Sequence, residues 1–350
     1  MMYVHKKMRS LLLLQLLLLV VVVVAEPDKP DSPQCHPDDE AALLAIDSAL
    51  GNPYHFASWS SDTPCCDWYD VRCDNDSGRI ISLYVFQDAN LTGTIPDAIA
   101  NLTHLRDLTL HHLPQLSGDI PESLAALSEL SQLTISWTAV SGPVPSFLGA
   151  LTTLTLLDLS FNALTGTIPA SLAEPPYLSG INLSRNRLVG PIPAALFSKL
   201  APQEDVYLWL SHNNLSGSIP AAWAAVNMVH VDLSRNALTG DASMLFGRGK
   251  ALQYVDLSRN ALSFSMSGVE IPEQVYVMDV SHNGITGSIP AQVANLTNLQ
   301  LFNVSYNKMC GAVPTGGNMD RFDAYCYRHN KCLCGAPLSA TCRRYTTIKT

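Results

Sequence analysis

One short motif recurs along most of the chain at a nearly constant interval. The motif is Gly-x-[Ile/Val]-Pro, and its copies begin at Gly93, Gly118, Gly142, Gly166, Gly190, Gly217, Gly287 and Gly311. Most copies are 24 residues apart, and degenerate copies at Gly240 and around Phe264 bring the number of units to ten. A unit this short cannot bury its own apolar face, so units of this kind must stack into a solenoid.

The clearest unit shows what each position does. It contains Leu148, Leu151, Leu154, Leu157, Leu159, Asn162, Leu164, Gly166, Ile168 and Pro169. Leu157 and Leu159 alternate with Asp158, which predicts a strand with the leucines inward and the aspartate outward. The asparagine recurs, and we expect a buried amide ladder of Asn162, Asn186, Asn213, Asn236, Asn260, Asn283 and Asn307. The period is typical of leucine-rich repeats. We predict an α/β solenoid, a right-handed leucine-rich-repeat superhelix with a parallel concave β-sheet.

The outward strand positions of successive units form rows across such a sheet, with roughly 4.8 Å between coils. The central row is predicted to hold Tyr84, Thr109, Thr134, Asp158, Asn182, Trp209, Asp232, Asp256, Asp279 and Asn303. A second row, just past the strand, holds His111, His112, Trp137, Phe161, Arg185, His212, Arg235, Arg259, His282 and Tyr306. Exposed Trp, Tyr and Arg are typical of interface hot spots. We therefore predict that the concave face binds another macromolecule.

Two structural interpretations of these rows remain open. Trp137 and Trp209 could pack against neighbouring coils without any role in binding. Arg235 and Arg259 could form surface ion pairs with the aspartates of the central row.

The ends of the chain predict secretion. Residues 1–25 combine three basic residues, an apolar or amide run from Leu11 to Val24 and a small residue at Ala25, which is the pattern of a signal peptide. The run is shorter than the roughly 20 residues that cross a bilayer, and no second span follows. We expect three further parts: an N-terminal cysteine-rich cap at 26–78, ten repeats at 79–314 and a C-terminal cysteine-rich cap and tail at 315–350.

Nine cysteines lie in two clusters that coincide with the two caps. In a secreted chain such clusters predict disulfides that staple the ends of the solenoid, with one thiol left over. Zinc is the alternative, but Cys65-Cys66 and Cys332-Leu333-Cys334 lack the spacing of structural zinc ligands. We expect no metal and no cofactor. Within the N-terminal cap, Asp38, Asp39 and Glu40 precede a predicted short amphipathic helix at 41–50.

The charge balance excludes one class of partner. The chain carries a net charge of −9, and removal of the signal peptide leaves 18 basic against 30 acidic residues, about −12. A strong nucleic-acid binder is therefore not expected.

Several segments make the chain similar to the polygalacturonase-inhibiting proteins of plants. The repeat matches the plant-type pattern Leu-x-x-Leu-x-Leu-x-x-Asn-x-Leu-x-Gly-x-Ile-Pro, and the irregular unit at 240–247 and the segments 316–323 and 331–338 resemble that family more specifically. The resemblance implies disulfides Cys35–Cys65, Cys66–Cys73, Cys310–Cys332 and Cys334–Cys342, with Cys326 outside the pattern. Asp70 stands where such caps usually carry glycine.

The resemblance also implies a function and a site. Members of the family inhibit fungal endopolygalacturonases in the plant cell wall, or apoplast, by covering the substrate cleft. The matching target-binding positions are Trp137, Asp158, Ser179, Tyr207, Trp209, Asp232 and Gln253. We add the neighbouring Asp256 to this candidate site. A cationic strip that resembles the family's pectin-contacting positions contains Arg185, His212, Arg235 and Arg259.

Three other functions are less well supported by the sequence. Adjacent carboxylates such as Asp232, Asp256 and Asp279 have the separation that glycosidases use, but an open, wet face with flanking arginines should keep them ionised, so we expect no enzyme. A soluble receptor or co-receptor for a peptide or developmental ligand is the main alternative. Ice binding would require flat rows of Thr or Asn.

Asn-x-Ser/Thr sequons fit passage through the secretory route. The candidate glycosylation sites are Asn75, Asn90, Asn101, Asn214 and Asn295. Asn182 and Asn303 are sequons on the predicted concave face, and we expect them to stay unmodified.

Overall fold

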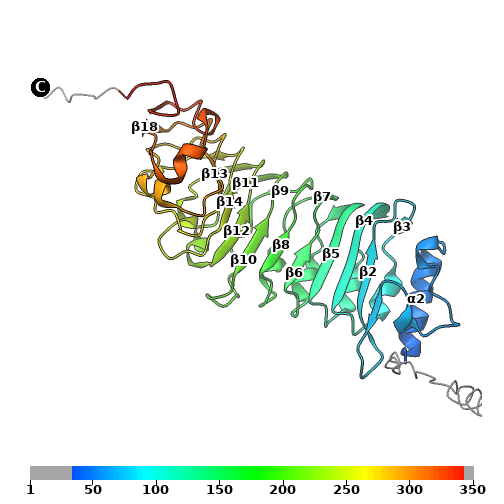
Figure 1. Ribbon diagram of the computed structural model, residues 1–350. Coiled ribbons are helices and arrows are strands. Elements are labelled where there is room, and N and C mark those ends of the chain that lie inside the picture. Colours follow the sequence, from blue (N-terminus) through cyan, green and yellow to red (C-terminus); the bar gives the residue numbers. More distant parts are fainter. Residues whose placement is uncertain (1–33, 343–350) are drawn as a thin grey trace, which may run out of the picture.

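The protein is an elongated, curved solenoid in which one long sheet runs from the N-terminal to the C-terminal cap (Figure 1). The computed structural model describes residues 34–342, so the signal peptide expected at 1–25 lies outside the described residues. Within 34–342, no helix has the length and apolar character to cross a membrane.

The long sheet has 13 strands, and all of its pairs are parallel except β1 with β2. Its main path is β1 (Val71–Cys73), β2 (Ile80–Phe86), β4 (Asp107–Gly118), β5 (Gln132–Pro143), β6 (Leu156–Asp158), β8 (Gly180–Asn182), β10 (Val206–Trp209), β12 (Met228–Asp232), β14 (Tyr254–Asp256), β16 (Val277–Asp279) and β17 (Leu301–Asn303). β3 (Thr92–Thr94) pairs with β4, and β7 (Ala163–Thr165) pairs with β5. The predicted leucine-rich-repeat solenoid with a parallel sheet is confirmed.

A second sheet of four short parallel strands lies past the turns of four successive coils. It consists of β9 (Val189–Gly190), β11 (Asn214–Ser218), β13 (Ala237–Gly240) and β15 (Ala261–Leu262). The chain then returns through 3-10 helices, and prolines of the repeat motif stand directly before six of them. The helices of the return path are 97–101, 122–126, 146–150, 170–173, 221–225, 243–245 and 291–295. Residues 198–205, which lengthen the interval between the motif copies at Gly190 and Gly217, form turns directly before β10.

The core is one continuous cluster of buried apolar side chains, in which the leucines of the repeats predominate. Leu157, Leu159 and Leu164 are fully buried, whereas Asp158 between the first two is half-buried and faces outward. The same alternation recurs from coil to coil, so the outward face of each strand is not needed for the core and can contact a partner.

The predicted asparagine ladder is confirmed by its hydrogen bonds. Asn260 Nδ2 donates to the carbonyls of Leu233 and Leu257 at 2.9 and 3.1 Å, and its Oδ1 accepts from Leu238 N at 3.0 Å. The ladder extends past the ten expected units, because Asn330 makes the same bonds to Val304 and Tyr327. The segment expected as a C-terminal cap therefore begins with a further partial coil.

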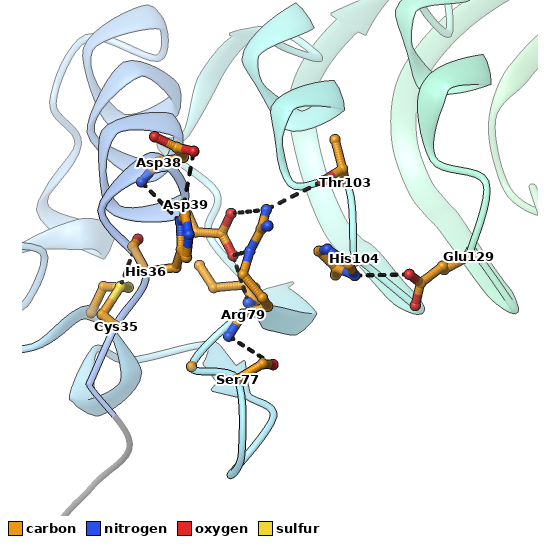
Figure 2. Close-up of polar contacts among 12 residues, drawn as sticks. Cys35, His36, Asp38, Asp39, Ser77, Arg79, Thr103, His104 and Glu129 are labelled. Carbon is orange, nitrogen blue, oxygen red and sulfur yellow. Dashed lines mark hydrogen bonds and ion pairs between the residues drawn. A yellow bond between two sulfur atoms is a disulfide. The ribbon is translucent and has the colours of Figure 1, made fainter.

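The N-terminal cap is held by a buried ion pair. Helix α2 (Pro37–Ala49) begins four residues before the predicted start at 41. Its Asp39 is fully buried and accepts from Arg79 Nε at 3.0 Å, Arg79 Nη2 at 2.7 Å and Ile80 N at 2.7 Å (Figure 2). Arg79 also donates to Thr103 in the first repeat, so one side chain links α2, the sheet and the repeats.

Both ends carry the disulfides implied by the family resemblance. The pairs are Cys35–Cys65, Cys66–Cys73, Cys310–Cys332 and Cys334–Cys342, and Cys326 is a free thiol. Short 3-10 helices at 54–56 and 65–67 complete the first cap; those at 317–321 and 324–326, with β18 (Cys310–Ala312) and β19 (Cys332–Cys334), complete the second. Asp70 adopts a left-handed φ of 69°, and its carboxylate lies 2.7 Å from His55 Nε2.

Candidate interaction surface on the concave sheet

The strand register brings the predicted central row together. Asp232, Asp256, Asp279 and Asn303 pair with one another from strand to strand, as do Asp158, Asn182, Trp209 and Asp232. Parallel strands lie roughly 4.8 Å apart, so these side chains form one continuous file. We call it the aspartate file.

Each carboxylate of the aspartate file also stabilises its own coil. Oδ1 of Asp158, Asp232, Asp256 and Asp279 accepts from the amide of the serine two residues later, at 2.8 to 3.0 Å. Asn182 and Asn303 make the same bond through their amide oxygens. Because an asparagine can replace the aspartate in this turn, the turn does not require the negative charge.

The Oδ2 atoms of these aspartates differ from the Oδ1 atoms in their hydrogen bonding. Asp279 Oδ2 accepts from Asn303 at 3.1 Å, whereas no hydrogen bond reaches Oδ2 of Asp158, Asp232 or Asp256 from residues 34–342. Three acceptors on the aspartate file therefore remain for a partner.

Asp256 is more strongly desolvated than the expectation of an open, wet face implied for these carboxylates. Burial raises its pKa to about 6, and the bonds from Ser258 and the nearby acids modify that value only in part. The concave face is thus less wet at Asp256 than its open shape suggests, since desolvation disfavours the charged carboxylate.

Asp256 should give the protein a measurable pH dependence. Its folded-state pKa lies above the value of 3.8 for an exposed aspartate, so the folded state holds the proton longer than the unfolded chain does. Relative to an Asp256→Asn variant, the wild type should lose unfolding free energy as pH rises from about 4 to about 6, and the difference should be constant above that. Denaturant unfolding at each pH measures this; a difference that grows in the wild type's favour would contradict the assignment.

Aromatic rings line the file beside the aspartates. Trp209 lies 4.5 Å from the ring of His230, which stacks on Tyr254 at 4.0 Å. Burial lowers the pKa of His230 to about 4. The imidazole is therefore neutral at physiological pH, and its buried Nε2 has no partner within the described part of the chain. Tyr207, at 39 % exposure, continues this aromatic surface towards solvent.

The second predicted row follows the strands in left-handed backbone conformation. Arg185, His212, Arg235 and Arg259 have φ between 54° and 57°, like Trp137 and Phe161 earlier in the row. Backbone bonds to the next coil, such as Arg235 N to Ser258 O at 2.8 Å, hold this otherwise unfavourable conformation. His111 does not belong to the row, because it pairs with Ser136 inside β4 and β5.

Within the part of the chain that the structure describes, the cationic strip forms no ion pairs with the aspartate file. It consists of Arg185, His212, Arg235 and Arg259. Among residues 34–342, no ion pair joins Arg235 or Arg259 to Asp232, Asp256 or Asp279, so the alternative of local surface pairing is not seen. Burial and the flanking arginines lower the pKa of His212. At one end of the strip Arg185 lies 5.0 Å from the centre of the Phe161 ring, which stacks on Trp137 at 3.7 Å.

All the sequence-predicted positions lie on or beside the concave sheet. Trp137 is 46 % exposed and Gln253 and Tyr207 are exposed, whereas Ser179 and Trp209 are half-buried. The sequence analysis missed His230 and Tyr254. His230 pairs in register with Tyr207 and Tyr254 pairs with His230, and each of the two missed residues stands two residues before an aspartate of the file, on the same face of its strand. The alternation around Val231 and Val255 could have identified both.

The glycosylation candidates are accessible. Asn75, Asn90, Asn101, Asn214 and Asn295 are all exposed. Asn182 and Asn303 are half-buried, and their side-chain oxygens accept from serines of their own turns. That those two stay unmodified remains a prediction.

Comparisons with known proteins agree with this architecture. The leucine rich repeat N-terminal domain matches residues 36–74, and the leucine rich repeat matches 153–174 and 206–225. Polygalacturonase inhibitor 1 of Arabidopsis thaliana is 49 % identical over 306 residues, which cover 87 % of this chain and 92 % of that protein. The chain belongs to the polygalacturonase inhibitor family.

Further comparisons support this family assignment and add a structural neighbour. The polygalacturonase inhibitor of Pyrus communis is 48 % identical over 304 residues, covering 87 % of this chain and 91 % of the relative. A crystal structure of a plant ice-binding protein superimposes with a TM-score of 0.85 at 47 % identity, over 89 % of this chain and 99 % of that one. These relatives of the polygalacturonase inhibitor family are named for inhibition, so the chain is not an enzyme.

Proposed function

We propose that this protein is a secreted, extracellular inhibitor of fungal endopolygalacturonases that acts in the plant cell wall. The family assignment carries this proposal, since relatives that align over most of the chain are named polygalacturonase inhibitors. Stapling of both ends by disulfides fits an oxidising compartment.

The enzyme would dock on the concave face. A polygalacturonase must hold an anionic polymer with basic residues, and the unbonded oxygens of Asp158, Asp232 and Asp256 are suitable acceptors for such groups. Trp209 and Tyr207 supply aromatic area at the centre of the surface, where hot spots concentrate. Ser179, Gln253 and Trp137 extend the contact to both edges of the sheet. Docking there covers the substrate cleft, and inhibition requires no covalent chemistry.

Pectin is a second candidate ligand, and it would bind the cationic strip. Arg185, Arg235 and Arg259 are exposed, and in the described segment they are free of ion pairs with the aspartate file. Charges spaced along successive coils could contact carboxylates of a polyuronide.

The inhibitory function is tested by titrating the secreted protein against a panel of fungal endopolygalacturonases and following reducing-end release. We expect inhibition of at least one enzyme. Trp209→Ala should weaken it by about tenfold or more, and Asp232→Asn by several-fold, because the asparagine keeps the turn and loses only the charge. Asp119→Asn is the matched control, since Asp119 is exposed and outside the concave strands.

Two outcomes would change the proposal. If no enzyme of a broad panel is inhibited or bound, the receptor or co-receptor function becomes the better hypothesis. If inhibition occurs but Trp209→Ala and Asp232→Asn behave like Asp119→Asn, the inhibitor binds through another surface.

The structural likeness to an ice-binding protein does not extend to the flat rows of Thr or Asn that we expect of an ice-binding surface. The concave rows mix charged and aromatic residues, as the sequence indicated. Hydroxyls do recur just past the turns, but those of Ser117 in β4, Thr165 in β7 and Thr239 in β13 donate to the glycine carbonyl of the preceding coil at 3.3 Å. The strand pairing past the turn is also offset. Ser218, which follows Gly217 of one motif copy, pairs with Thr239, which precedes Gly240 of the next copy.

A further inference from the structure

A polar groove of about 550 Å³ lies at the edge of the concave sheet, where β14, β16 and β17 begin. Its lining residues are Gln253, Gln274, Tyr276, Thr297, Asn298, Gln300 and Arg321. Four amides, a hydroxyl, a phenol and one guanidinium line this space, and no carboxylate does. That composition is unusual in a chain with a net charge of −9.

The repeat architecture aligns these side chains. Tyr276 N donates to Gln253 O at 2.9 Å and Gln300 N donates to Tyr276 O at 2.7 Å, so the three residues hold the same place in successive coils. They are therefore separated by roughly 4.8 Å from coil to coil. Gln274 and Asn298 each precede one of them by two residues, which gives a second file beside the first.

The amides of the groove are available for a ligand. Gln253, Gln274, Asn298 and Gln300 are exposed, and their side chains make no hydrogen bond to other residues of the described range. An amide offers both donors and an acceptor, which matches a sugar hydroxyl that also donates and accepts. Tyr276 adds part of an aromatic ring.

Arg321 is fixed in place at one end. Its Nη1 donates to Leu299 O at 3.1 Å and its Nη2 to Asn318 Oδ1 at 2.8 Å. Asn318 is itself anchored, because it donates to the carbonyls of Leu296 and Thr297 at 2.8 and 2.9 Å. A guanidinium has five N–H donors, so three remain on a group whose orientation is already set.

We propose that this groove binds an acidic oligosaccharide, with a uronate carboxylate on Arg321 and ring hydroxyls on the four amides. A protein partner fits less well, because no aliphatic side chain and no tryptophan lines the groove. The groove shares Gln253 with the proposed enzyme-binding face but lies at the opposite ends of the strands from Arg185, Arg235 and Arg259. It therefore adds a second saccharide site and does not require that the protein inhibit an enzyme.

A neighbouring pocket bears on the design of the test. This pocket, of about 610 Å³, shares Gln274 and Thr297 with the groove and is also lined by Asn295. Asn295 is a glycosylation candidate, so a glycan there would occupy the pocket beside the groove. All titrations should therefore use the Asn295→Gln background, in which that sequon is absent.

The test is calorimetric titration of the full secreted protein with an oligogalacturonate of defined length. We expect saturable binding, and no binding of a neutral galactose oligomer of equal length. Arg321→Gln should weaken binding by about tenfold or more, because a charge-assisted contact is lost. The double variant Gln274→Ala/Asn298→Ala should weaken it comparably without touching a backbone bond. Arg187→Gln is the matched control, because Arg187 is exposed and belongs neither to the groove nor to the cationic strip, and it should change binding less than twofold.

Inhibition assays on the same variants separate this proposal from the proposed function. Arg321→Gln should leave inhibition of a polygalacturonase within about twofold. The groove proposal is wrong if the parent protein does not bind oligogalacturonate, or if Arg321→Gln binds it as tightly as Arg187→Gln does. Absence of inhibition with intact binding would instead contradict only the inhibitor function.

Discussion

Replacing Arg79 with alanine should destabilise the folded protein by about 3–5 kcal/mol. The substitution leaves the Asp39 carboxylate without its cationic partner, because this fully buried group receives two hydrogen bonds from Arg79. The hydrogen bond with Asp39 also raises the pKa of Arg79, in keeping with a strong interaction. Because Arg79 joins α2 to the first repeat (Figure 2), the loss should appear first as opening of the N-terminal cap.

A second substitution provides the decisive comparison. Adding Asp39→Asn to Arg79→Ala removes the unpaired charge, and the amide oxygen can still accept from Ile80 N. The double variant should therefore be more stable than Arg79→Ala alone. Asp38→Asn is the matched control, because the neighbouring Asp38 side chain is 82 % exposed, and it should change stability by less than about 1 kcal/mol. Denaturant unfolding measures all three; a double variant less stable than Arg79→Ala would show that the buried charge is not the cause.

The repeat made most of the fold predictable from sequence. A period of 24 residues fixes which positions stack, so the central row and the asparagine ladder could be assigned residue by residue, and both are present. The partial coil around Asn330 could not be predicted, because Tyr325, Tyr327 and Cys332 stand where the clearest unit carries its leucines.

The candidate site was only partly predictable, for a physical reason. Sequence spacing shows that Asp232 faces outward, but it does not reveal that Oδ1 is used by Ser234 and that only Oδ2 is left for a partner. Nor does it reveal how deeply Asp256 is desolvated, which depends on the packing of the folded coils around it. The groove at Arg321 was missed because its residues come from three coils and a cap that share no motif.

Replacing one asparagine of the ladder with alanine should also be severe. Asn213 Nδ2 donates to Leu183 O and Leu210 O at 2.9 and 3.1 Å, and its Oδ1 accepts from Leu188 N at 3.0 Å. Alanine would leave these backbone groups without a partner, and each buried group costs about 1–3 kcal/mol. We expect Asn213→Ala to lower the free energy of unfolding by about 3 kcal/mol or more.

The neighbouring residue is a natural control. Asn214 is exposed, so Asn214→Ala should change stability by less than about 0.5 kcal/mol once N-glycans are removed from all samples. Hydrogen exchange gives a local measurement beside denaturant unfolding. The amide of Leu188 should lose protection in Asn213→Ala but not in Asn214→Ala, because that amide donates to the deleted side chain. If Leu188 stays protected while stability falls, packing and not the ladder bond supports this coil; if both variants are equally stable, water replaces the amide, and the ladder contributes little to holding the solenoid together.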